Sequence, residues 1–166
     1  MSPAQVGRTL TRLAYEIVER NQGAENLVVM GLEQAGARLA RSLARRLSEM
    51  ESRQVESHGL DVTSFRDDLD STPVDPAVPD ADSIDLTDRD VILVDDVLCS
   101  GRTVRAALDA VIRFGRPRSI QLMVLIDRGH REYPIRPDYV GKTIPTKSGE
   151  NVVVEQGEEV TVYVVD

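Results

Sequence analysis

Two adjacent acids, Asp95 and Asp96, follow directly on the apolar run Val91–Val94. A continuously apolar run of this kind is typical of a strand that is covered on both faces in a parallel sheet. The acids are then delivered to the carboxyl edge of the sheet, where open α/β sheets bind their ligands. Two carboxylates at that edge could accept hydrogen bonds from the hydroxyl groups of a sugar.

The next residues, Cys99–Thr103, form a turn rich in small and hydroxyl side chains that opens a helix. Gly101 allows the backbone to approach a ligand closely, and the free N–H groups and dipole at a helix start favour a phosphate. Ser100 and Thr103 add hydroxyl donors. The alternative is a plain strand end followed by a helix that Ser100 caps. Two acids next to a small-residue turn favour a site for a sugar phosphate.

The elements that position this segment follow from hydrophobic periodicity. Apolar residues recur at helical spacing in three segments: 5–20, 37–50 and 102–114. Short apolar runs predict strands in five others: 27–30, 91–94, 120–126, 152–155 and 160–165. Residues 55–65 are predicted to be extended. The last two strands predict an antiparallel pair, and the strand–helix–strand order over 91–126 predicts a βαβ unit with a right-handed crossover.

Residues 67–90 differ from the rest of the chain. They contain three Pro and many Asp, and no Lys or Arg stands between Arg66 and Arg89. We predict a long, mobile surface loop, because the segment lacks apolar periodicity. Loops of this length are uncommon in compact domains and are often functional, although the composition alone fits a disordered acidic insertion equally well.

Composition sets the class of protein. With 166 residues, 41% of them apolar, the chain is long enough for one domain over 1–166 with an aliphatic core. The single cysteine, Cys99, excludes an internal disulfide and a zinc cluster. No signal peptide or membrane-spanning stretch is evident, so we expect a cytoplasmic protein. The net charge of −8 argues against a general, sequence-independent nucleic-acid binder.

The segment VILVDDVLCSGRT, at 91–103, resembles the phosphoribosyl-pyrophosphate motif of type I phosphoribosyltransferases. Within that superfamily the likeness is greatest to the PyrR family of pyrimidine operon attenuators, which are also uracil phosphoribosyltransferases. Four further segments carry the likeness: 8–21, 60–69, 105–117 and 127–146. The last, DRGHREYPIRPDYVGKTIPT, makes it specific to this family.

The resemblance implies an α/β fold of the type I phosphoribosyltransferase kind, with a central, mainly parallel sheet flanked by helices. A flexible lid would lie at 67–90, and 127–166 would include a small hood and a C-terminal hairpin. The implied ligands are phosphoribosyl pyrophosphate and uridine nucleotides such as UMP. Mg²⁺ would be held largely by pyrophosphate and ribose oxygens, so no dedicated protein metal ligands are expected. A homodimer or homotetramer is also implied, without a membrane.

The resemblance also assigns roles in the ligand site. Asp95 and Asp96 would hold the ribose hydroxyls and help to stabilise an oxocarbenium-like centre. Asp127, Arg128 and Val152 would meet the pyrimidine. The 5′-phosphate would bind to six residues: Leu98, Cys99, Ser100, Gly101, Arg102 and Thr103.

Attenuators of this family bind a hairpin in the leader mRNA. The residues that match their RNA-facing pattern are Thr11, Arg12, Arg20, Arg131, Arg136 and Lys142. Tyr15 stands where the family usually has His, and a tyrosine could stack on an unpaired base. A solvated helix face is the simpler reading for any one of these arginines, but their grouping in two segments favours RNA.

Two departures bear on catalysis. Gln34, Ala35 and Gly36 replace the Thr-Arg-Gly that grips pyrophosphate in related enzymes, and Glu33 adds a negative charge. The 67–90 segment lacks the basic residues that the family's lid carries. Loss of one such contact can cost ~2.7–4 kcal/mol of transition-state stabilisation, or ~10²–10³-fold in rate.

We therefore expect weak or absent uracil phosphoribosyltransferase activity, with nucleotide binding retained. The alternatives are an active nucleobase phosphoribosyltransferase without an RNA role, and a degenerate nucleotide-binding protein with neither function.

Overall fold

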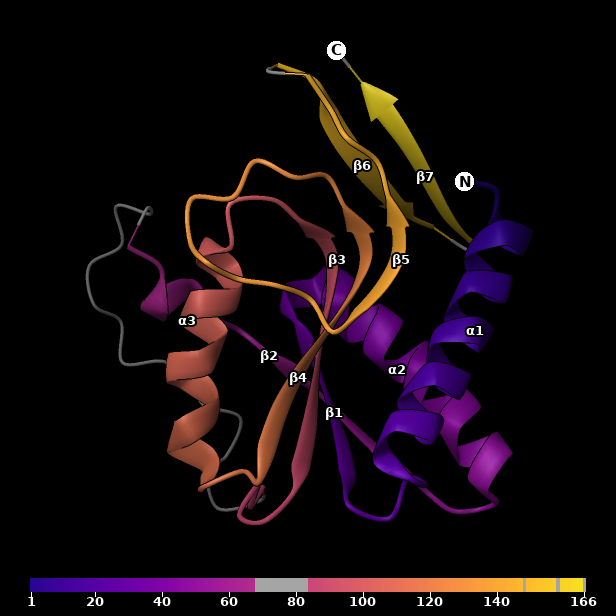
Figure 1. Cartoon of the computed structure of the whole chain (residues 1–166), viewed down its shortest axis with the longest axis vertical. Coiled ribbons are helices and arrows are strands. Elements are labelled where there is room, and N and C mark those ends of the chain that lie inside the picture. Colours follow the sequence, from indigo (N-terminus) through magenta and orange to yellow (C-terminus); the bar gives the residue numbers. More distant parts are fainter. Residues whose placement is uncertain (68–83, 148, 158, 166) are drawn as a thin grey trace.

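The computed structural model describes residues 1–67, 84–147, 149–157 and 159–165 (Figure 1). A parallel sheet of five strands lies at its centre, in the order β2-β1-β3-β4-β5. The strands are β1 (Leu27–Leu32), β2 (Glu56–Leu60), β3 (Asp90–Leu98), β4 (Ser119–Asp127) and β5 (Tyr139–Thr143). An antiparallel hairpin of β6 (Asn151–Gln156) and β7 (Val160–Val165) stands apart from this sheet. The predicted parallel sheet and C-terminal hairpin are thus confirmed.

Helices cover both faces of the sheet. The helices α1 (Pro3–Asn21) and α2 (Glu33–Glu51) pack on one face, and α3 (Arg102–Val111) packs on the other (Figure 1). Two short 3₁₀ turns, η1 (Thr63–Phe65) and η2 (Ile112–Phe114), follow β2 and α3. No helix among the described residues is long and apolar enough to cross a membrane.

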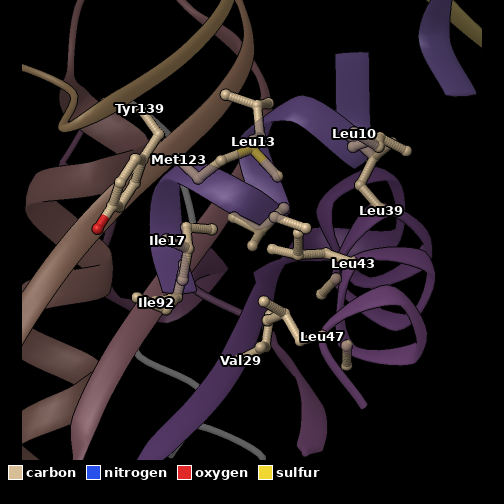
Figure 2. Close-up of a cluster of buried hydrophobic side chains, with 14 of the residues drawn as sticks. Leu10, Leu13, Ile17, Val29, Leu39, Leu43, Leu47, Ile92, Met123 and Tyr139 are labelled. Carbon is tan, nitrogen blue, oxygen red and sulfur yellow. The ribbon is translucent and has the colours of Figure 1, made fainter. Parts of the chain in front are cut away.

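Alternate residues of the central strands enter two separate aliphatic clusters. Ile92 and Val94 face α1 and α2, where they join Leu13, Ile17 and Leu43 (Figure 2). Their neighbours along β3, Val91 and Leu93, join the α3 side of the core instead. Each fully buried side chain of this size contributes about 1.5–3 kcal/mol. Burial on both faces explains why β3 reads as a continuously apolar run, and it holds the two acids at a fixed place.

The structure differs from the predicted boundaries where β1 meets α2. The segment Gly31–Gly36, expected as a loop, is the end of β1 joined directly to the first turn of α2. Two glycines make this junction possible, because a Cβ on Gly31 would lie 2.4 Å from the Cα of Ala37, and one on Gly36 would lie 2.4 Å from the carbonyl oxygen of Val94. The helix therefore begins at Glu33, four residues before the predicted start.

Two other predictions needed correction, and one strand was missed. The segment 55–65 is extended only over β2, and a 3₁₀ turn follows it. The strand predicted at 91–94 runs on to Leu98, so Asp95 and Asp96 lie inside it. The edge strand β5 was not predicted at all. The predicted lid at 67–90 lies mostly outside the described residues, and of its described part Leu86 is buried in the α3 side of the core.

Candidate functional site

The two acids lie near the carboxyl end of β3, where Asp95 pairs with Val124 of β4 and follows Val94, the last residue that pairs with β1. Asp95 is buried, with 8% of its surface exposed, and Asp96 is partly buried. The Asp96 N–H donates to Asp95 Oδ1 at 3.0 Å, and the Val97 N–H donates to Asp96 Oδ1 at 2.8 Å. Each carboxylate thus accepts a hydrogen bond from the next peptide group, which orients it.

The environment of Asp95 disfavours its charge. Burial and the neighbouring charge of Asp96 raise the pKa of the Asp95 carboxyl well above its usual range, and Glu33 adds a smaller effect in the same direction. A protonated Asp95 can donate a hydrogen bond as well as accept one. The pair therefore suits neighbouring sugar hydroxyls, each of which both donates and accepts.

The phosphate turn, residues 99–103, follows β3 directly. Gly101 has a φ of 92° and precedes the first residue of α3. Its carbonyl oxygen accepts the N–H of Arg105, and Ser100 Oγ accepts the N–H of Arg102 at 3.3 Å. The first N–H groups of a helix have no partner within it, so those of Thr103 and Val104 suit an anion. Phosphate binding at this turn stays a prediction.

A second segment braces this turn from outside. The carbonyl oxygen of Ser100 accepts the N–H groups of both Glu132 and Tyr133 at 3.0 Å. The Arg102 side chain turns toward the same segment, with its guanidinium 2.7 Å from Glu132 Oε2, 3.0 Å from Asp67 Oδ1 and stacked over the Tyr133 ring. These partners raise the pKa of Arg102. The backbone of Arg102 therefore belongs to the cradle, while its side chain holds the surrounding loops.

Asp127 ends β4 and pairs with Leu98 across the sheet, so the candidate nucleobase residue stands next to the phosphate turn. Arg131 holds it there, donating to Asp127 Oδ2 at 2.7 Å, to the Cys99 carbonyl at 3.1 Å and to the Ile135 carbonyl at 2.9 Å. Partial burial tends to raise the pKa of Asp127, but the bonds from Arg131 and the Gly129 N–H outweigh it and lower that pKa.

The other two candidate nucleobase residues belong to the junction with the hood hairpin, β6–β7. Arg128 donates to Thr146 Oγ1 at 3.2 Å, to Asn151 Oδ1 at 2.9 Å and to the Glu150 carbonyl at 2.6 Å. Val152 packs against the core from β6. The guanidinium of Arg128 thus fastens the hood to the end of β4, a role that its position in the sequence did not indicate.

The candidate pyrophosphate residues Gln34, Ala35 and Gly36 lie in the first turn of α2. The Ala35 carbonyl accepts a hydrogen bond from Gln156 Nε2 at 3.1 Å, which ties this turn to the hood. Glu33, which precedes them, has a φ of 54° and lies 3.6 Å from Arg66 in an ion pair. Sequence reasoning noted Glu33 but missed its pairing with Arg66.

Most of the candidate RNA residues gather along α1 and the adjoining edge strand β5 (Figure 1). Arg12 and Lys142 line one hollow, Arg20 and Arg136 line a second, and Thr11 and Tyr15 line a third. Arg12 and Arg20 are about half exposed, in ion pairs with Glu16 and Asp138. Arg131 is the exception, because its guanidinium points inward to Asp127 and the phosphate turn.

Comparisons with known proteins agree with this geometry. A family model described as a phosphoribosyl transferase domain matches residues 4–160. The chain is 54% identical to a protein named Bifunctional protein PyrR from Deinococcus radiodurans, over 95% of this chain and 87% of the relative. It is 50% identical to a protein of the same name from Oceanobacillus iheyensis, over 96% of this chain and 90% of the relative.

Solved structures share the fold. A hypoxanthine-guanine phosphoribosyltransferase from Bacillus anthracis superposes with a TM-score of 0.68 at 24% identity, over 89% of this chain and 82% of that one. A hypoxanthine phosphoribosyltransferase from Staphylococcus aureus gives a TM-score of 0.67 at 19% identity, over 88% of this chain and 77% of that one. Identities this low establish the architecture alone.

Proposed function

The chain belongs to the PyrR family of phosphoribosyltransferases, and from that premise we propose that it is a uridine-nucleotide-responsive regulator of pyrimidine biosynthesis. It binds UMP at the carboxyl ends of β3 and β4 and binds a leader mRNA hairpin through α1 and β5. The observation that carries the nucleotide site is the adjacency of three groups: the Asp95–Asp96 pair, the phosphate turn 99–103 and the anchored Asp127.

In this proposal each group takes one part of the nucleotide. The first-turn N–H groups of α3 and the hydroxyls of Ser100 and Thr103 hold the 5′-phosphate. Asp95 and Asp96 hold the ribose 2′- and 3′-hydroxyls. Asp127 and the hood residues Arg128 and Val152 border the space for the pyrimidine.

The transfer reaction has less support than binding. Ala35 offers no cation to a leaving pyrophosphate, Glu33 adds a carboxylate two residues earlier, and no basic residue occurs between Arg66 and Arg89. The two site carboxylates fit a Mg²⁺ that takes most of its ligands from substrate oxygens and water, and such an ion would partly neutralise a bound pyrophosphate. The proposed function is therefore that of a nucleotide sensor with weak or absent uracil phosphoribosyltransferase activity.

The RNA part of the proposal rests on the distribution of charge. Arg12, Arg20, Arg136 and Lys142 follow one side of the molecule, although the chain as a whole carries a net charge of −8. Local basic surfaces can steer a polyanion to an acidic protein. The ion pairs of Arg12 with Glu16 and of Arg20 with Asp138 are exposed, so RNA phosphates can compete with these carboxylates at little cost. The Nη2 of Arg12 also donates to the Val140 and Gly141 carbonyls of β5, which orients its guanidinium at this surface. A cytoplasmic homodimer or homotetramer remains part of this proposal.

Calorimetric titration with UMP tests the nucleotide site, and a gel-shift assay with the leader hairpin, with and without UMP, tests regulation. We expect saturable UMP binding, and tighter RNA binding when UMP is present. RNA affinity that does not respond to UMP would contradict the regulatory proposal. In a steady-state assay with uracil, phosphoribosyl pyrophosphate and Mg²⁺, turnover of about 1 s⁻¹ or more, the low end of ordinary enzymes, would contradict weak activity.

A further inference from the structure

A hollow of about 740 Å³ opens at the carboxyl ends of β1 and β2, on the side of Asp95 away from β4. The described residues that line it are Glu33, Gln34, Ala35, Ala37, Gly59, Leu60, Asp61 and Thr63. This lining includes two carboxylates and no basic side chain. A substituent of the bound ribose that is directed toward β1 therefore enters a space lined by carboxylates. A substituent directed toward β4 instead meets Asp127, whose charge is already neutralised by Arg131.

Glu33 stands at the edge of this hollow nearest to the sugar acids. The register of β1 and β3 pairs Gly31 with Val94, the residue before Asp95, and Glu33 begins α2 two residues later. The charge of Glu33 reaches Asp95, because it contributes to the raised pKa of that carboxyl. A negatively charged group bound beside Asp95 would meet the same field.

Arg66 is a cation at the same rim, three residues beyond Thr63 of the lining. Its side chain is 22% exposed, and its Nη1 lies 3.6 Å from Glu33 Oε1. The guanidinium that could neutralise a second anionic group is thus already engaged by Glu33. A pyrophosphate would have to displace Glu33 from Arg66 and leave that carboxylate next to its own charge.

We propose that Glu33, paired with Arg66, makes this site select a nucleoside monophosphate over a ribose phosphate that carries a pyrophosphate group. This inference rests on the proposed uridine nucleotide site. UMP carries one phosphate, which binds at the start of α3, and its neutral base is directed toward Asp127. Phosphoribosyl pyrophosphate places additional negative charge in the hollow, where Glu33 and Asp61 repel it. Glu33 is thus a specificity-determining residue that biases the site toward sensing product.

Calorimetric titration of the wild type and of Glu33→Gln tests the inference, with UMP and with phosphoribosyl pyrophosphate plus Mg²⁺ as the two ligands. In Glu33→Gln we expect the affinity for phosphoribosyl pyrophosphate to rise about tenfold, because one repulsive charge is removed from the lining of the hollow. The affinity for UMP should change by less than about twofold, because UMP places no charged group in the hollow that Glu33 lines.

Glu25→Gln is the matched control, because it removes the same charge from an exposed position before β1, at the opposite edge of the sheet. It should change neither affinity.

The outcomes separate this inference from the function on which it rests. Normal UMP binding with an unchanged affinity of Glu33→Gln for phosphoribosyl pyrophosphate would overturn the selectivity inference alone. An equal gain for both ligands would also overturn it, because Glu33 would then act on the shared phosphate or ribose. Failure of the wild type to bind UMP would overturn the nucleotide site and the selectivity together.

Discussion

Gly101 holds the phosphate turn in the left-handed region, with a φ of 92°, immediately before α3. A Cβ at this position would lie 3.0 Å from Ile135 Cγ1 and 3.2 Å from Ile135 Cβ. Glycine therefore meets two requirements here, a backbone conformation that other residues rarely adopt and close contact with the segment that braces the turn. The sequence predicted only a close approach of the backbone to a ligand at Gly101, and the structure shows both of these requirements.

Gly101→Ala is expected to destabilise the fold by about 1–3 kcal/mol, because the positive φ is strained for alanine and the methyl group meets Ile135. UMP affinity should fall as well, since the turn must shift. Urea denaturation and calorimetry measure the two effects. Gly157→Ala is the control and should leave both unchanged, because its added methyl group would have nothing within 4 Å and its φ is not positive. Unaltered UMP affinity in Gly101→Ala would argue against the proposed cradle.

Asp95 predicts a distinct pH dependence of stability. Its pKa is raised in the folded protein by burial and by Asp96, so the folded state binds a proton more tightly than the unfolded state. Stability is then lost as the pH rises from the ordinary aspartate pKa, about 4, toward the raised folded value. Asp95→Asn removes this loss and keeps an oxygen for the Asp96 N–H.

The melting temperature of Asp95→Asn should therefore exceed that of the wild type at pH 7, and the difference should shrink toward pH 4. Thermal melts across this range measure it. Asp85→Asn is a suitable comparison, because the pKa of Asp85 is lowered by its bonds from Thr87 and its substitution should not stabilise the protein. A difference between Asp95→Asn and the wild type that is the same at pH 4 and pH 7 would contradict this account.

At the scale of elements, Arg131 connects three parts of the site: the end of β4, the phosphate turn and the loop that follows. Its position in a basic segment suggested an RNA contact, but its guanidinium is directed toward Asp127 and two backbone carbonyls. Arg136, five residues later in the same loop, instead lines a surface hollow with Arg20. The sequence predicted an RNA contact for both arginines, but the side chain of Arg131 is directed inward and that of Arg136 lines the surface.

Arg131→Gln should cost about 1–3 kcal/mol of stability, because Asp127 Oδ2 and the Cys99 carbonyl lose the donor that Arg131 provides, although Asp127 Oδ1 keeps the Gly129 N–H. UMP affinity should fall with it, since the turn and Asp127 lose their common support. Arg136→Gln should change stability by no more than about 0.5 kcal/mol, as is usual for surface substitutions. Equal stabilities for the two variants in urea denaturation would show that Arg131 does not hold the site together.

At the scale of the whole molecule, the site and the basic surface occupy different regions joined by the 128–143 segment. This segment leaves β4 beside the phosphate turn, contacts it through Glu132 and Tyr133, and returns as β5 next to α1. A ligand that orders the phosphate turn thus acts on the segment that carries Arg136 and Lys142. This continuity gives nucleotide binding a physical route to the RNA surface.

Single substitutions Arg12→Gln, Arg20→Gln and Lys142→Gln should each weaken binding of the leader hairpin and lower the slope of log K against log salt by about 1. Filter binding at several salt concentrations measures the slope. UMP affinity should be unchanged, because these residues lie away from the phosphate turn. Arg116→Gln, on the loop before β4, removes an equal charge outside the basic surface and serves as the control. An unchanged slope in all three variants would contradict an RNA surface along α1.

The sequence by itself determined the central part of this protein. The apolar run before Asp95, the two acids and the small-residue turn were enough to predict a sugar-phosphate site. A strand buried on both faces is visible in the sequence as a continuous apolar run, and the start of a helix is visible as a group of small and hydroxyl residues. The order of helices and strands followed from periodicity for the same reason. β5 was missed because it is a short edge strand with Gly141 and Lys142, held in place by long-range contacts such as the buried Tyr139 hydroxyl on Gln121.

Only the tertiary structure decided how side chains from distant segments combine. Arg131 and Arg136 are indistinguishable in sequence, yet one is turned inward by Asp127 and the other lies at the surface. Glu33 and Arg66 are 33 positions apart in the sequence, and β1 and β2 bring them within 3.6 Å. Charge pairing of this kind depends on distance in space, which local patterns do not encode, and it determines here whether a guanidinium is free to receive a ligand or is already engaged.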